Sequence, residues 1–233
     1  MFKKKTIFNS DLPEGLCIID EGGGIHVSPY DTWNSELGYT GIGINSEGHS
    51  FVMGIPDNIQ NEYNGSDLSI NTKKLFSDVL WNPNGINVPI DSYVTNINLA
   101  REDFSSKENT NSILAALAAS SNPNEIDNAA VVARNYSKGC IGKGQWDLPA
   151  GGIFEVITSF SSDIAAILIE QLKVENPSQL NLIYGSVWTS SVSLINEHND
   201  YYSAYEARIP MGVTTDYGGM LMKYYVLPVY TIK

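Results

Sequence analysis

The sequence predicts an α+β fold, and three observations lead to that prediction. Short runs of apolar residues, separated by glycine-rich turns, fill about the first sixty residues and are typical of antiparallel strands. Segments with helical spacing follow in the middle of the chain. Strand-like alternation returns over about the last fifty residues. Strands grouped at both ends, with helices between them, favour an α+β domain over repeated βαβ units.

The N-terminal strands are expected to form two hairpins. The predicted strands are residues 16–20, 25–27, 39–44 and 50–55. Glycine-bearing turns at 21–24 and 45–48 separate the members of each pair. Gly41 and Gly43 lie inside a predicted strand and indicate close backbone packing or a bulge there.

Residues 57–110 have the least regular pattern in the chain. They contain long runs of Asn, Ser and Asp and a turn cluster at 81–85. A stretch of this length without periodicity is unusual in a compact domain unless it is an insertion or a binding surface. We therefore expect a loop-rich insertion with short strands such as 86–90.

Helices are predicted over residues 112–119, 128–136 and 153–172. The first is rich in alanine and leucine. Asp127 or Asn128 can cap the second. The third repeats apolar residues at helical spacing, and residues 161–163 can interrupt it.

The hinge between the second and third helices contains Trp146, Leu148 and Pro149. Pro149 cannot continue a helix, because it lacks an N–H and clashes with the preceding turn. Trp146 and Leu148 are two residues apart, so in an extended segment they face the same side. We expect this segment to be a core anchor between the two helices; a stacking platform at Trp146 is the alternative.

Aromatic residues are concentrated in the C-terminal third, where strands are expected at 185–191, 201–209 and 221–230. Tyrosine is enriched on recognition surfaces because it offers amphipathic contact area at low entropic cost. The alternative is that strand alternation places half of these rings in the core. The predicted ligand contacts are Trp188, Asn199, Tyr201 and Tyr202, the last three beside a polar turn.

Composition limits the class of protein. The 233 residues include 42% hydrophobic and 17% charged residues, which indicates a folded globule. The net charge of −12 argues against a nucleic-acid partner, because phosphate binding needs clustered Lys and Arg. We expect residues 15–233 to form a single domain.

Residues 1–14 are predicted to be an N-terminal arm. It begins with three lysines at positions 3–5. A frayed terminus and an arm that docks on a partner are both compatible with this pattern. The apolar run that follows is too short for a signal peptide, and no stretch is long enough to cross a membrane. We therefore expect synthesis in a cytoplasm without export or membrane insertion.

No catalytic residue, metal site or cofactor is predicted. The three histidines lie in separate segments, without metal-ligand spacing to Cys or carboxylates. Cys17 and Cys140 lack C-x-x-C spacing and are expected to be free thiols, with a disulfide as the alternative. Lys138 and Lys143 are expected to lower the pKa of Cys140. The chain is not expected to be an enzyme.

A resemblance to a known family rests on the segment Trp146-Asp147-Leu148-Pro149 and on Glu155. These residues resemble the W-x-L-P…E signature of a C-type-lectin-like family found in Bacteroides and their bacteriophages. Residues 187–191 are similar to the family's Y-W-S-S-T strand, with Val in place of the first aromatic. Residues 226–229 are similar to its V-R-P-V end, with Leu in place of Arg. The spacing to Glu155 is displaced by one residue.

The resemblance implies a C-type-lectin-like domain with a mixed antiparallel sheet, two helices and long loops. It further implies a non-enzymatic virion protein of the head-fibre or tail-fibre type, with host attachment as one use of the domain. The implied partners are other virion proteins, further copies in a dimer or trimer, and a host-surface glycan or protein. The alternative is a bacterial adhesin-like protein that binds glycan or protein. An oxidase of the formylglycine-generating type would need Cys17 and Cys140 adjacent in space.

Overall fold

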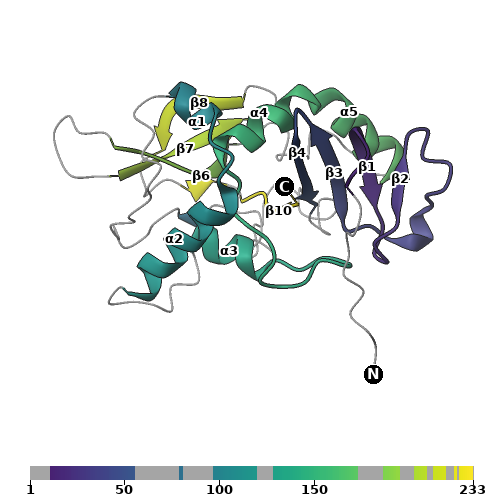
Figure 1. Cartoon of the computed structure of the whole chain (residues 1–233), viewed down its shortest axis with the longest axis horizontal. Helices are drawn as coiled ribbons and strands as arrows, with labels where there is room; N and C mark the ends of the chain where they lie inside the picture. The colour runs from purple at the N-terminus through teal and green to yellow at the C-terminus, as the bar shows by residue number, and fades with distance from the viewer. Residues whose placement is uncertain are drawn as a thin grey trace, which may run out of the picture.

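The computed structural model describes residues 11–55, 79–80, 97–119, 128–172, 186–194, 202–208, 212–218, 223–224 and 226–232. The fold is α+β, as the sequence predicts: antiparallel strands lie at both ends of the chain and helices lie between them (Figure 1). The described residues form five α-helices, more than the three predicted from helical spacing and more than the two that the resemblance implies.

The larger sheet has five antiparallel strands in the order β10-β4-β3-β1-β2. They are β1 (Gly15–Ile19), β2 (Ile25–Val27), β3 (Gly41–Ser46), β4 (His49–Gly54) and β10 (Val229–Thr231). The two predicted hairpins, β1–β2 and β3–β4, are confirmed. Val229 of β10 lies opposite Met53 of β4, so the end of the chain completes the N-terminal sheet.

Two smaller sheets contain the remaining strands. β6 (Ser186–Leu194), β7 (Tyr202–Arg208) and β8 (Gly212–Gly218) form one, and β5 (Val79–Leu80) pairs with β9 (Lys223–Tyr224) in the other. The single strand expected over 221–230 is wrong, because β9 and β10 belong to different sheets. The buried Val226 and Leu227 connect them. Strand β8 was not predicted.

The helices are α1 (Ile97–Arg101), α2 (Ser106–Ala118), α3 (Ala129–Asn135), α4 (Gly151–Ser159) and α5 (Ser161–Ala166). A π-helical segment, η2 (Ile167–Gln171), follows α5, and a short 3₁₀ turn, η1 (Ser35–Leu37), follows β2. Asn128 caps α3 as expected, since its side chain accepts from the amides of Ala130 and Val131. Helix α1 and the start of α2 lie within 57–110, where only loops and short strands were expected.

The single helix predicted over 153–172 is broken near Phe160, beside the interruption expected at 161–163. Helix α4 and the following α5–η2 segment meet at an angle of 71°. Phe160 ends α4 with φ −103° and ψ 11°, outside the helical range, and its carbonyl accepts from the amide of Ile164 in the next helix. The bend places α5 beside β1 and β2 (Figure 1).

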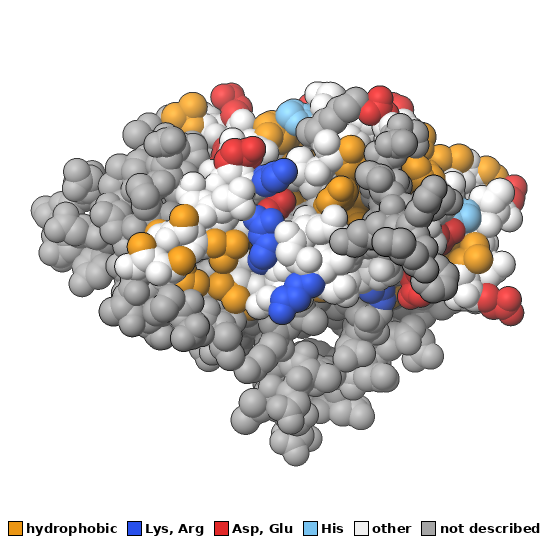
Figure 2. Space-filling view, turned by 60° about the horizontal axis from the view of Figure 1, so that its bottom comes forward, with side chains coloured by type: hydrophobic (Ala, Val, Ile, Leu, Met, Phe, Trp, Pro, Cys, Tyr) orange, Lys and Arg blue, Asp and Glu red, His pale blue; other side chains and the backbone are white. Residues whose placement is uncertain are grey.

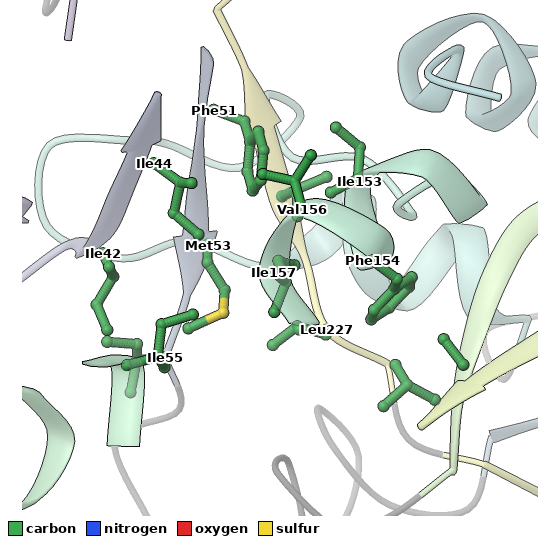
Figure 3. Packing of buried hydrophobic residues seen from close by; sticks show 14 of the residues in the cluster. Ile42, Ile44, Phe51, Met53, Ile55, Ile153, Phe154, Val156, Ile157 and Leu227 are labelled. Carbon is green, nitrogen blue, oxygen red and sulfur yellow. The ribbon is translucent and has the colours of Figure 1, made fainter. Parts of the chain in front are cut away.

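Helix α4 lies at the centre of the main core. Figure 3 shows its side chains Ile153, Val156 and Ile157 close to residues of β3 and β4. The same helix contacts β8, β7 and β6 of the second sheet. The main core comprises Ile42, Ile44, Phe51, Met53, Ile153, Phe154, Ile157, Val213 and Leu227, among other buried residues. One apolar helix therefore holds the two larger sheets together, and burial of each such side chain contributes about 1.5–3 kcal/mol.

The hinge before α4 is buried on both sides. Trp146 packs in a second cluster, the tryptophan cluster, formed with Leu12, Cys17, Ile19, Val52, Tyr136 and Ile141. Leu148 packs in a third cluster together with residues of α2, α3 and β6. Neither side chain has accessible surface. The expected core anchor is confirmed, and the stacking platform at Trp146 is excluded.

A buried carboxylate, Asp103, ties the hinge to its neighbours. Its Oδ2 accepts from the Ser191 hydroxyl at 2.6 Å and from the Asn109 amide at 2.9 Å. Its Oδ1 accepts from the Ser105 amide at 2.9 Å. Ser191 Oγ in turn accepts from the Gly151 amide at 2.9 Å, at the start of α4. Hydrogen bonds to a carboxylate are strong, so this network fixes the beginning of α4 against β6 and α2.

Candidate functional site

The candidate binding site is a groove of about 410 Å³ between the start of β1, the residues after β2, and the α5–η2 segment. Leu16 of β1 contributes to one side, and Asp163 and Ile167 contribute to the other. The bend after α4 creates this site, because a straight helix would not place α5 beside β1 and β2.

The groove combines carboxylates with apolar surface. Glu14, Asp163 and Glu170 are among the described residues that line it, and none of those residues is Lys or Arg. Leu16 and Ile167 add apolar surface between them. Such a lining favours a ligand that carries positive charge and aliphatic or aromatic groups, because each part meets a complementary surface.

Tyr30 lies at the β2 side of the groove, in an uncommon conformation. It has φ 64°, which non-glycine residues rarely adopt, and follows the cis bond between Ser28 and Pro29. Its amide donates to the Val27 carbonyl at 2.7 Å. Burial raises the pKa of the Tyr30 hydroxyl, and the charges of Cys17 and Asp163 act in the same direction. The phenol therefore remains a neutral hydrogen-bonding group at physiological pH.

A chain of polar contacts holds the β1–β2 turn. His26 Nε2 lies 2.9 Å from Asp20 Oδ2, and His26 Nδ1 lies 2.9 Å from Thr32 Oγ1. Asp20 Oδ1 also accepts from the Gly24 amide at 2.7 Å. Burial acts to raise the pKa of Asp20, but the hydrogen bonds from His26, Gly24 and Gly22 outweigh it and lower that pKa. These contacts fix the turn, and we assign them a structural role.

The predicted ligand residues do not form the site. Trp188 has no accessible surface and packs against α2 and α3, so the prediction that it contacts a ligand was wrong. Strand alternation placed this ring in the core, which was the alternative considered. Tyr202 begins β7, but its side chain lies outside the described residues, as do Asn199 and Tyr201.

The four motif residues occupy structural positions. Trp146 and Leu148 are core residues, and the Pro149 carbonyl accepts from the Ser190 amide at 2.7 Å. Glu155 does not open the helix as the resemblance implied, because α4 begins at Gly151.

Glu155 acts instead as an acceptor toward the second sheet. Its Oε1 accepts from the Val213 amide of β8 at 2.9 Å and lies 3.3 Å from Arg101 Nε. Arg101 also donates to the Val213 carbonyl at 3.0 Å. Glu155 and Arg101 together hold the start of β8 against α4 and α1.

Both cysteines are free thiols, as expected. Burial raises the pKa of Cys17 to about 12 and also raises that of Cys140, despite a hydrogen bond from Thr40. The expectation that Lys138 and Lys143 lower the pKa of Cys140 was therefore wrong. Lys138 lies over the Tyr39 ring at 4.4 Å instead. Within the described ranges, no group of three His, Cys, Asp or Glu side chains has the geometry of a metal site.

A second charged feature is a group of Lys and Arg side chains, opposite in sign to the carboxylates of the groove. Figure 2 shows Lys and Arg side chains gathered across the middle of one face, while most Asp and Glu lie toward its margins. Arg134 Nη2 lies 2.8 Å from the buried Asp147 Oδ1, and Lys107 is close enough to act on the charge of Asp147. Both cations act on the charge of Asp147, and we assign no ligand to them.

Sequence reasoning missed the groove residues Glu14, Tyr30 and Asp163. One signal was available: Asp163, Ala166, Ile167 and Glu170 follow the i, i+3, i+4, i+7 spacing of one helix face. A face that mixes carboxylates with apolar residues differs from the uniformly apolar face of α4.

Comparisons of the chain with protein-family models, with curated proteins and with solved structures found no match. Among the described helices, none is by itself long and apolar enough to cross a membrane. The bent pair of α4 with α5–η2 meets that criterion by length and composition alone.

Proposed function

We propose that the chain is a non-enzymatic structural protein of a bacteriophage virion, of the head-fibre or tail-fibre type. In this proposal it presents a C-type-lectin-like domain and binds other virion proteins or a host-surface molecule. The observation that carries the proposal is the W-x-L-P segment. Trp146 and Leu148 anchor it in two clusters between α3 and α4. A fully buried segment of this kind supports the view that the motif specifies a fold used for display and binding.

The groove supplies a surface for that binding role. It is lined by carboxylates and apolar residues and has a volume of about 410 Å³. Binding modules need a concave surface with a few charged groups that fix orientation. The step from a binding module to a virion protein rests on the resemblance, because one fold can serve many functions.

Quantitative mass spectrometry of purified phage particles, with host membranes and culture medium measured in parallel, tests the proposal. We expect the chain in particles at a fixed ratio to the major capsid protein. Recovery from bacterial membranes or medium, with none in particles, would contradict it and support an adhesin-like protein instead. A capsid protein that copurifies at constant stoichiometry through a density gradient is the control for contamination.

A further inference from the structure

We infer that the groove binds residues 1–8 of a second copy of this chain. This inference adds to the proposed function by naming what the groove binds. It rests on the proposed function only for the place where the chain acts, the virion. Three features support it: the chemistry of the groove, the sequence of the N-terminal segment, and the point at which that segment leaves the sheet.

The chemistry of the two surfaces is complementary. Residues 1–8 read Met-Phe-Lys-Lys-Lys-Thr-Ile-Phe, with three adjacent lysines flanked by apolar side chains. The groove offers the carboxylates of Glu14 and Asp163 beside Leu16 and Ile167. Three of the 14 Lys and Arg residues lie in this segment of a chain with net charge −12, so it is the most concentrated positive charge in the sequence. Opposite potentials of this kind select a partner and its register.

The exit point of the segment favours a second copy over the same chain. Leu12 is 2% exposed and packs in the tryptophan cluster, on the face of β1 that carries Cys17 and Ile19. Leu16 lines the groove. It lies on the same face of β1 as Ile18, which packs in the main core. Side chains alternate between the two faces of a strand, so Cys17 and Leu16 face opposite ways, and Leu12 lies on the face opposite the groove.

The attachment point of the segment is fixed. Asn45 Nδ2 donates to the Leu12 carbonyl at 2.6 Å, and this bond joins the chain to β3. Ten extended residues reach at most about 35 Å, enough to cross to a neighbouring molecule. Exchange of such segments closes a dimer or a cyclic trimer, because each copy supplies one segment and one groove.

A charge-swap experiment on the full chain tests the inference. Light scattering after size exclusion gives the mass of four proteins: wild type, K3E/K4E/K5E, E14K/D163K, and the combination of both sets. We expect a dimer or trimer for wild type, monomers for each one-sided reversal, and recovery of the wild-type mass for the combination. E36K/E102K is the matched control, because both residues are exposed and neither lines the groove.

A second measurement reports on the groove without requiring an oligomer. A fluorescent peptide of residues 1–8 is titrated onto K3E/K4E/K5E, followed by anisotropy. We expect binding that weakens at least tenfold in K3E/K4E/K5E/E14K/D163K and falls with added salt, because salt screens exposed charges. Circular dichroism establishes that each variant is folded before its result is counted.

Three outcomes would overturn the inference: a monomeric wild type, an unchanged oligomer in E14K/D163K, or a combination that stays monomeric. Peptide binding unaffected by the groove substitutions would overturn it as well. These results are independent of the particle measurement, since a chain absent from virions can still exchange segments in solution. Conversely, a virion component can fail the charge swap.

Discussion

The carboxylate of Asp147 lies 2.8 Å from the Arg134 guanidinium, and only 4% of the Asp147 side chain is exposed. Among the residues that the structure describes, neither Asp147 Oδ1 nor Arg134 Nε has a well-directed hydrogen-bond partner, so attraction between the charges dominates the contact. Burial raises the pKa of Asp147 to about 6, and Arg134 and Lys107 only partly offset that effect. The hinge therefore contains a charge that is costly to bury.

Asp147→Asn is expected to change the pH dependence of stability. The unfolded state loses this proton near the ordinary aspartate pKa of 3.8, whereas the folded state keeps it until about pH 6. The free energy of unfolding therefore falls as pH rises through this window, and the penalty is complete above it. Urea unfolding at pH 4 and pH 7 should show that the difference in unfolding free energy between Asp147→Asn and wild type shifts in favour of Asn between the two pH values, by about 1 kcal/mol or more.

Glu36→Gln serves as the control for that measurement, because Glu36 is exposed on η1. The same difference between pH 4 and pH 7 in the control, or a loss of stability in Asp147→Asn at pH 7 alone, would contradict the assignment to Asp147.

Trp146→Ala is expected to cost about 3–5 kcal/mol of unfolding free energy, the range for removing a buried aromatic side chain. The substitution deletes an edge-to-face contact with Tyr136, with ring centroids 4.7 Å apart, and a hydrogen bond to the Ile141 carbonyl. Trp146→Phe keeps part of the ring and should cost less. Chemical denaturation monitored by circular dichroism measures both, and a loss below about 1 kcal/mol for Ala would contradict a core role.

Asp103→Asn is expected to destabilise the protein by about 2–4 kcal/mol, because an amide has one acceptor oxygen where the carboxylate has two. In either orientation the NH2 group faces a donor, either the Ser105 amide or the Asn109 side-chain amide with the Ser191 hydroxyl. Ser191→Ala removes only one contact of that carboxylate and should cost less. Thermal unfolding ranks the two variants. Equal stability of Asp103→Asn and wild type would show that the Asp103 hydrogen-bond network does not stabilise the fold.

The two cysteines are expected to differ in their reaction with iodoacetamide at pH 8. Cys17 has a pKa near 12 and no accessible surface, so it should label only on unfolding. Cys140 is partly exposed and should label in the native state, though more slowly than a free peptide thiol because burial raises its pKa. Mass spectrometry of the labelled peptides measures both rates, with the urea-unfolded chain as reference. Faster labelling of Cys17 would contradict the packing.

Local signals in the sequence predict the hairpins β1–β2 and β3–β4 and the capped start of α3. Helix α2 was predicted only in part, because buried Ser106, Asn109 and Thr110 occupy its first turns. Polar residues on a buried face give no apolar period, and their partners, such as the Leu148 amide bonded to Thr110, are distant in sequence. Periodicity detects burial of apolar groups and not the long-range hydrogen bonds that stabilise a polar face.

The candidate groove was unpredictable for a related reason. The pattern over residues 153–172 predicts a helix with an interruption at 161–163, but it does not predict the direction that the chain takes after the break. The 71° change in direction depends on how Phe160 and its neighbours pack in the main core. Trp188 shows the opposite error: an aromatic residue in a tyrosine-rich region was expected at the surface, yet β6 directs it inward. In both cases tertiary packing decides which face of an element meets solvent.

The position of β10 has a consequence for the order in which the chain folds during synthesis. β4 and the hinge both emerge long before their shared partner: Val229 pairs with Met53 and exchanges two backbone hydrogen bonds with Asp147. Until β10 is translated, β4 is an open sheet edge, and open edges can pair with other chains. A chain truncated upstream of Val229 would therefore be prone to aggregation, and the synthesis of β10 protects this fold from misassembly.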